Sequence, residues 1–137
     1  MAADYLLDTS IVSDLIHDHR KVVSRVTVLS PAGRLFICSI VRGEVVYGLE
    51  RLPHGRKRRE LTERVLGILA VLPCEPVPVA AGDEYASFRR ARERKGLTLD
   101  DNDVWIAATA MALDMVLVTR DADFVKLDGL LTEDWTR

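Results

Sequence analysis

The sequence predicts an α/β protein in which a parallel sheet of four or five strands is flanked by helices. Short, apolar and partly β-branched segments at 35–38 and 115–118 suit strands that are buried on both faces. Helical stretches separate these segments, and helical crossovers make neighbouring strands parallel, with right-handed connections. Acidic residues follow strands or begin helices, and those places meet at the carboxyl edge of an open α/β sheet.

Length and composition fit one domain spanning residues 1–137. Hydrophobic residues are 48% and charged residues 29% of the 137, which is ordinary for a globular protein. No apolar run approaches the roughly 20 residues of a membrane helix, and no signal peptide is visible, so we expect a cytoplasmic protein. The net charge of −2 argues against a protein that coats nucleic acid by charge alone. Cys38 and Cys74 lack the spacing of a disulfide scaffold or zinc site, and we expect both to be thiols in or near the core.

The first half of the chain predicts two strands, each followed by helices. Apolar residues recur at helical spacing after each short strand. In chain order we expect a strand at 4–7, a helix from about Ile11, a helix at 20–30, a turn at 31–33, a strand at 35–38, and a helix at 39–52 capped by Ser39.

The second half ends in a buried helix and a buried strand. A proline-punctuated stretch can hold at most a short edge strand, because proline cannot join a central ladder. In chain order we expect a helix at 56–70, that edge segment at 72–79, a helix at 80–95 closed by Gly96, a helix opened by Asp103 and apolar on nearly all sides, a strand at 115–118, and a short strand at 130–131.

Four acids share a placement near the carboxyl edge of the predicted sheet. Asp8 follows the first strand, Asp103 opens a helix, and Asp121 follows the strand at 115–118. Glu44 lies on the apolar stripe of its helix, where an ionised carboxylate is costly unless it is paired or bound to a metal. Each acid also has an ordinary explanation: Asp8 or Ser10 can cap a helix, and Glu44 can pair with an arginine.

Taken together, the four acids predict a site for divalent cations. Converging carboxylates without a counter-charge repel one another and are driven to protonate. Arg42 and Arg120 are the nearest basic residues, and they cannot neutralise all four acids. Carboxylate oxygens suit Mg²⁺ or Mn²⁺, and the absence of histidine argues against zinc. Such clusters generally support phosphoryl transfer, because a bound ion activates a water for attack on phosphorus.

Four segments together resemble a known family. These are LLDTSIVSDLI, SIVRGEVVYGL, DNDVWIAATAMALDMVLVTRDADF and LLTEDW. They resemble PIN-domain ribonucleases and, more closely, the VapC-type toxins of prokaryotic type II toxin–antitoxin modules. The pattern D-x-W-I-A-A followed by L-V-T-R-D-x-D-F is the most specific part, and the resemblance spans nearly the whole chain.

The resemblance implies a three-layer PIN-like fold and an endoribonuclease that depends on Mg²⁺ or Mn²⁺. The family's acids fall on Asp8, Glu44, Asp103 and Asp121. Asp8, Asp103 and Asp121 would hold the metal, and Glu44 would bind it through water or orient the attacking water. Cleavage would leave a 3′-hydroxyl and a 5′-phosphate. Ser10 and Thr119 match hydroxyl positions that support the site, although both can also be explained as caps.

Two positions of this assignment stay open. Asp101 lies two residues before Asp103 and competes for the role of third acid, although Asp103 directly precedes the motif. Asp123 can share or replace the role of Asp121, because this region varies among relatives.

The resemblance also implies partners. Relatives are homodimers held inactive by a small VapB-type antitoxin, which binds operator DNA on behalf of the complex and inserts its C-terminal segment into a groove near the acids. RNA is the implied substrate, and no membrane is involved. The basic helix start formed by Arg56, Lys57, Arg58 and Arg59 is either a solvated face or an RNA contact.

Three other readings are less compatible with the residues. A receiver domain needs an acid pair near the first strand and a late lysine, whereas Asp8 has no acidic neighbour. A HAD-type phosphatase needs D-x-D after the first strand, and Asp8-Thr9-Ser10 lacks the second aspartate. A PIN fold used only for binding is disfavoured because all four acids are present.

Overall fold

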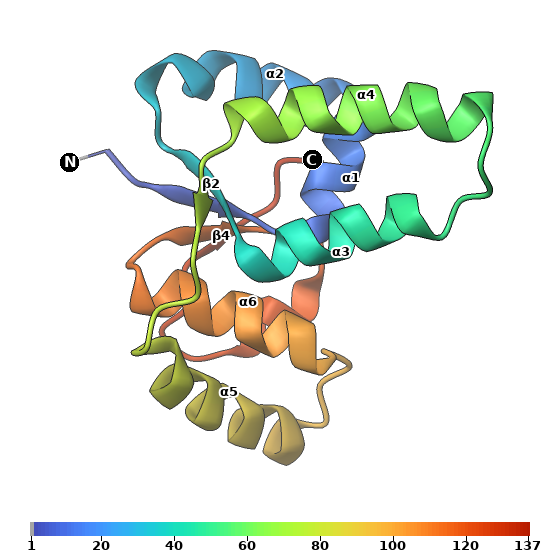
Figure 1. Cartoon of the computed structure of the whole chain (residues 1–137). Helices are drawn as coiled ribbons and strands as arrows, with labels where there is room; N and C mark the ends of the chain where they lie inside the picture. The colour runs from blue at the N-terminus through green and yellow to red at the C-terminus, as the bar shows by residue number, and fades with distance from the viewer. Residues whose placement is uncertain (1) are drawn as a thin grey trace.

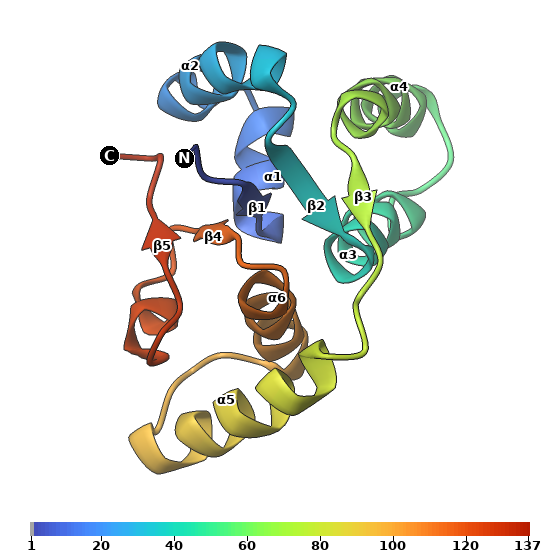
Figure 2. The same ribbon diagram turned by 90° about the vertical axis from the view of Figure 1, so that its left-hand side faces the viewer.

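A five-stranded parallel sheet runs through the centre of the molecule. The computed structural model describes residues 2–137, and the strands lie in the order β3-β2-β1-β4-β5 (Figure 2). All four pairs of neighbouring strands are parallel, as the sequence predicts. The strands are β1 (Tyr5–Leu7), β2 (Leu35–Cys38), β3 (Cys74–Glu75), β4 (Val116–Val118) and β5 (Thr132–Glu133).

Helices cover both faces of the sheet and give three layers. In Figure 1, α2 and α4 lie above the sheet with α1, whereas α6 lies below it and α5 lies on the outer side of α6. Helix α3 contacts α1, α4 and α6, so it bridges the layers. The helices are α1 (Thr9–Ile16), α2 (Arg20–Leu29), α3 (Ser39–Glu50), α4 (Arg56–Val71), α5 (Ala81–Lys95) and α6 (Asp101–Ala112), with short 3₁₀ turns η1 (Ser30–Ala32) and η2 (Ala122–Lys126).

At the centre of the core, the paired strands β1 and β4 lie between α1 on one face of the sheet and α6 on the other (Figure 1). Leu6 and Leu7 of β1 are fully buried. Three alanines of α6 are equally buried, and their small side chains let the helix lie close to the sheet: Ala107, Ala108 and Ala110. Leu7 pairs with Val118, so the residues that follow these strands, Asp8 and Thr119, leave the sheet side by side. The register therefore fixes where the acidic residues meet.

The structure differs from the sequence prediction at several edges of the fold. The last strand is Thr132–Glu133 instead of 130–131, because Leu130 packs into the core and Leu117 pairs with Thr132. Cys38 is buried as expected, but Cys74 is exposed because it lies on the edge strand β3. Ser39 is the first residue of α3 and does not cap the helix. The N-cap residue is Cys38, whose side chain makes no capping hydrogen bond. No helix in residues 2–137 is long and apolar enough to cross a membrane.

Candidate active site

Asp8 is buried between the end of β1 and the start of α1. Its Oδ1 accepts hydrogen bonds from the Ser10 hydroxyl at 2.6 Å and from the Ile11 backbone N–H at 3.0 Å. Asp8 thus caps α1, and Ser10 supports Asp8 directly. Burial raises the pKa of the Asp8 carboxyl, and hydrogen bonds from Ser10, Thr119 and Ile11 together with the Arg120 charge oppose that rise. The structural role as a cap and a role in chemistry are compatible, because only one oxygen is needed for the cap.

Asp103 lies in the first turn of α6 and does not open the helix as the sequence analysis expected. Asp100 is the N-cap: its carboxylate accepts from the Asp103 N–H, and the Asp103 Oδ2 accepts from the Asp100 N–H at 3.1 Å. This reciprocal capping box fixes the start of the helix. Burial, followed by repulsion from Asp100, Glu44 and Asp121, raises the pKa of Asp103 to about 6, although the hydrogen bond from the Asp100 N–H opposes the rise.

Asp101 is directed away from this cluster into an ion pair. Its Oδ1 lies 2.9 Å from a guanidinium nitrogen of Arg92, at the end of α5. The same nitrogen of Arg92 donates to the Leu99 carbonyl at 3.2 Å, so Asp101 helps to hold the loop between α5 and α6. The contacts therefore favour Asp103 over Asp101 as the third acid of the site.

Glu44 faces Asp103 from α3. Its Oε1 accepts from the Thr9 hydroxyl at 2.5 Å, and its Oε2 lies 3.5 Å from the Asn102 amide nitrogen. The buried stripe of α3 consists of Val41, Val45 and Leu49, so Glu44 lies at the edge of that stripe and is half-buried rather than fully inward. No ion pair to Glu44 occurs within the described chain, so an arginine partner does not explain its position.

Thr9 and Asn102 are two polar contacts of the site that the sequence analysis did not single out. Thr9 directly follows Asp8, and Asn102 directly precedes Asp103. Adjacency to an acid was the available signal, but only the packing of α3 against α1 and α6 shows that both side chains converge on Glu44.

Asp121 and Asp123 have different surroundings although both lie at the start of η2. The exposed Asp121 accepts the Asp123 N–H as the cap of η2, and its own N–H donates to the Thr119 hydroxyl at 3.1 Å. Asp123 accepts from the N–H and hydroxyl of Thr98 and from the Lys126 ammonium at 3.1 Å. Those hydrogen bonds and that charge hold the pKa of Asp123 at about 2. Asp121, whose charge repels Asp103, is the better candidate for the fourth acid.

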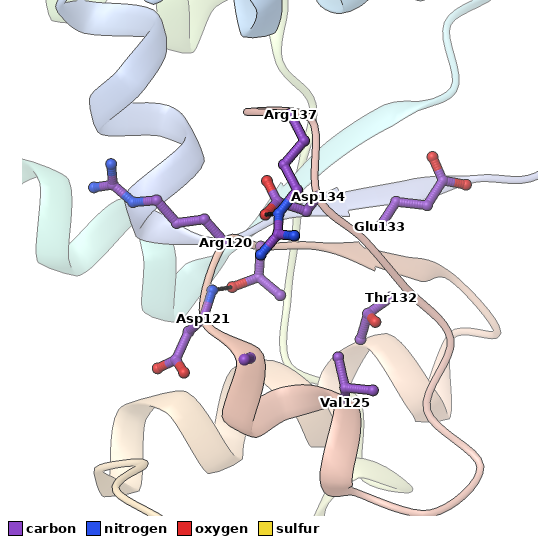
Figure 3. Close-up of a pocket in the computed structure, with 9 residues that line it drawn as sticks. Arg120, Asp121, Val125, Thr132, Glu133, Asp134 and Arg137 are labelled. Carbon is purple, nitrogen blue, oxygen red and sulfur yellow. Dashed lines mark hydrogen bonds and ion pairs between the residues drawn. The ribbon is translucent and has the colours of Figure 1, made fainter.

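Arg120 lies close enough to act on the charge of Asp8, but it is already paired with another acid. Its guanidinium lies 3.1 Å from the Oδ1 of the buried Asp14 on α1. Figure 3 shows Arg120 extending toward α1, whereas the Asp121 carboxylate points away from Arg137 and Asp134. Arg120 therefore moderates the charge of Asp8 without neutralising the other acids.

The donors present fit a hard divalent cation. Asp8, Glu44, Asp103 and Asp121 offer only oxygen atoms. The pKa of Asp103 is raised first by burial and then by repulsion from Asp100, Glu44 and Asp121. Within residues 2–137, no group of three or more acidic, histidine or cysteine side chains is already arranged to hold a metal ion. Mg²⁺ keeps several waters and is usually bound through one or two carboxylates, so these acids suit it by their chemistry without forming a complete ligand set.

Two of the basic residues at the start of α4 make local contacts. Arg56 pairs with Glu60 at 2.9 Å. Arg58 donates to the Leu52 carbonyl at 3.0 Å and lies 3.5 Å from Glu50. Lys57 and Arg59 are exposed. The segment therefore offers fewer free charges than its sequence suggests.

The fold and its acidic edge define a three-layer α/β protein with an open carboxylate site, and the comparisons place it in a family. A family model described as "PIN domain" matches residues 5–130. The chain therefore belongs to the PIN-domain family, as the sequence motifs predicted.

Relatives resemble the chain over nearly its whole length. It is 29% identical over 140 residues to "Ribonuclease VapC1" of Haemophilus influenzae (strain R2866), covering 97% of this chain and 98% of that one. It is 26% identical over 133 residues to "tRNA(fMet)-specific endonuclease VapC" of Shigella flexneri, covering 96% and 98%. A solved structure, VapBC2 from Rickettsia felis bound to a promoter DNA fragment, has a TM-score of 0.85 at 27% identity and covers 96% and 98%.

Proposed function

We propose that the protein is the toxin of a VapBC-type toxin–antitoxin module, an endoribonuclease that hydrolyses RNA and so arrests translation and growth. The observation that carries this proposal is the gathering of acids at the carboxyl edge of the sheet, where Glu44 and Asp121 repel the half-buried Asp103. The similarity to VapC ribonucleases along nearly the whole chain supports it. We also propose that Mg²⁺, or Mn²⁺ in its place, is the cofactor.

Each acid has a proposed role in the reaction. Asp8, Asp103 and Asp121 would hold the cation, with the Ser10 and Thr119 hydroxyls keeping Asp8 in place. The bound cation would activate a water and stabilise charge on the phosphate oxygens. Glu44, positioned by Thr9, would accept a hydrogen bond from the attacking water and orient it.

The products follow from water as the nucleophile. The water oxygen forms a bond to phosphorus while the bond to the 3′ oxygen breaks, which leaves a 3′-hydroxyl and a 5′-phosphate. In this proposal Glu44 would accept a proton from the attacking water, and the departing 3′ oxygen would take a proton from solvent. The 2′-hydroxyl plays no part, so no cyclic phosphate is expected.

An apolar groove beside the acids is the proposed seat of the antitoxin. It has a volume of about 260 Å³ and is lined by residues of α1, α3 and α4, which include Ile16, Val45, Leu49, Leu61 and Glu44. A VapB-type segment with an apolar face and a basic residue would fill the groove and pair with the acids. The solved VapBC2 complex supports this partner. In our proposal the toxin is a cytoplasmic homodimer that reaches operator DNA only through the antitoxin.

Cleavage of total RNA by the purified protein tests the function. We expect discrete fragments with Mg²⁺ or Mn²⁺, none with EDTA, and none from Asp8→Asn or Asp103→Asn. Fragments with 5′-phosphate ends would support the proposed chemistry. Cleavage that survives EDTA and both substitutions would contradict the assignment.

A further inference from the structure

Tyr47 is an exposed aromatic residue on the surface beside the candidate site. Its side chain is 62% exposed, and the other large apolar residues exposed to a similar degree in residues 2–137 are valine or leucine. It lies one helical turn after Glu44 on α3, away from the stripe that α3 buries. The packing of the core therefore does not explain an aromatic ring at this position.

A hollow of about 580 Å³ lies in front of this ring. Its walls include Tyr47, Arg51, Asn102 and Glu44. Gly43 and Gly48 border Tyr47 and Glu44, and a Cβ placed on either would meet nothing within 4 Å. The absence of side chains at these two positions leaves the space around the ring open to a ligand.

The chemistry of the walls suits a flat, partly polar ligand. The Arg51 guanidinium carbon lies 5.8 Å from the centroid of the Tyr47 ring, so the ring already has a cation over one face. Asn102 brings an amide that can both donate and accept hydrogen bonds. An aromatic face combined with an amide is the means by which proteins bind unpaired nucleobases, through stacking and hydrogen bonds to the base edge.

The hollow and the acid cluster share residues, which fixes where a base would lie. Thr9, Glu44 and Asn102 line the hollow, and the same three side chains are joined by hydrogen bonds at the candidate site. A base in the hollow would therefore belong to a nucleotide next to the phosphate that is cleaved.

We propose that Tyr47 stacks on an unpaired nucleobase adjacent to the scissile phosphate, with Asn102 contacting the edge of that base. This inference rests on the proposed endoribonuclease function and adds a requirement to it: the substrate is single-stranded at the cleavage site. Arg51 lies over the Tyr47 ring and supports it.

The test measures stacking directly with a short single-stranded RNA that contains 2-aminopurine, whose fluorescence falls when the base stacks. Binding is measured in the Asp103→Asn background, so that the RNA stays intact. We expect quenching with Tyr47 and with Tyr47→Phe. With Tyr47→Ala, quenching is lost and RNA binds roughly tenfold to a hundredfold more weakly. Adding the protein to the duplex form of the same RNA should cause no further quenching.

Matched controls separate stacking from folding and assembly. Val71→Ala removes an exposed apolar side chain from α4, outside the walls of this hollow, and should leave quenching unchanged. Thermal unfolding and gel filtration of each variant establish that fold and oligomeric state are retained. Unchanged quenching and affinity in a folded Tyr47→Ala would overturn the inference. So would a change confined to oligomeric state, which would make the ring part of a protein interface.

The inference and the proposed function fail in different ways. Cleavage of RNA by the unsubstituted protein, at the same rate in Tyr47→Ala, would remove the stacking role and leave the nuclease intact. Absence of metal-dependent cleavage by the unsubstituted protein would remove the function itself.

Discussion

Two short regions of the molecule each carry a pair of aspartates two residues apart, and the structure treats the pairs in opposite ways. At the start of α6, Asp101 pairs with Arg92 while Asp103 faces other acids and has a pKa raised to about 6. At η2, Asp123 is held by Thr98 and Lys126 with a pKa of about 2, while the charge of Asp121 repels Asp103. The site candidate is therefore the second aspartate at the start of α6, Asp103, but the first aspartate at η2, Asp121.

We propose from this comparison that the counter-charge, and not the motif, decides which acid is available for chemistry. Asp101 and Asp123 are matched to basic or hydroxyl partners and contribute to the fold. Asp103 and Asp121 repel each other instead. Substituting each member of a pair separates the two roles, because both substitutions remove one carboxylate from the same turn.

The largest expected effect is at the start of α6. Asp103→Asn should lower the rate of RNA cleavage at least ~100-fold, because it removes a carboxylate that would hold the metal. Asp101→Asn should leave the rate within a few-fold, since only its ion pair with Arg92 is lost. Initial cleavage rates at saturating Mn²⁺ compare the two. An equal loss in both variants would show that the turn, and not one acid, matters.

At η2 the expected contrast is in the kind of effect. Asp121→Asn should lower cleavage by roughly 10- to 100-fold and leave the melting temperature nearly unchanged. Asp123→Asn should lower the melting temperature and leave cleavage nearly unchanged, because it weakens the contacts with Thr98 and Lys126. Cleavage assays and thermal unfolding on both variants decide it. A cleavage defect larger for Asp123→Asn would reassign the fourth acid.

The fold could be predicted from the sequence because it follows from local patterns, whereas the assignment of the four acids to one site stays a prediction. Short apolar segments and the helices between them predict a parallel sheet, and acids after strands meet at its edge. The choice within each aspartate pair depends on Arg92, Thr98 and Lys126, which come from other segments of the fold. The sequence favoured Asp103 only through its motif, and left Asp121 and Asp123 open.

Other errors share that cause. Asp100, not Asp103, caps α6, because the two form a reciprocal pair that only the backbone geometry reveals. Cys74 is exposed because its strand lies at the edge of the sheet. The contacts of Thr9 and Asn102 with Glu44 join residues far apart in sequence, and no local pattern predicts them.

A smaller effect is expected one contact away from the acids. Thr9→Val keeps the shape of the side chain and removes the hydroxyl that donates to Glu44 at 2.5 Å. We expect the rate of cleavage to fall by about tenfold, because Glu44 stays in place but loses the hydrogen bond that positions its carboxylate. Thr9→Ser, which keeps the hydroxyl, is the matched control and should retain most activity. Equal rates in Thr9→Val and the unsubstituted protein would exclude this role.

The smallest expected effect is a pH dependence of stability with opposite signs in the two regions. In metal-free protein Asp103 has a pKa of about 6 against an ordinary 3.8, so its contribution to stability falls as pH rises from about 4 to 6. Asp123, lowered from 3.8 to about 2, contributes stability above pH 4 that is lost as pH falls toward 2.

Thermal unfolding in EDTA across this range compares the unsubstituted protein with Asp103→Asn and Asp123→Asn. Asp103→Asn should remove the loss of stability between pH 4 and 6, and Asp123→Asn should reduce the loss below pH 4. Identical pH profiles for all three proteins would contradict the assigned surroundings of both acids.

Direct measurement of Mn²⁺ binding by calorimetry, on the four single variants of the two aspartate pairs, tests the central claim most directly. The account predicts that Asp103→Asn and Asp121→Asn weaken binding strongly, while Asp101→Asn and Asp123→Asn bind like the unsubstituted protein. Tight binding that survives both Asp103→Asn and Asp121→Asn, or that is lost in Asp101→Asn or Asp123→Asn instead, would contradict it.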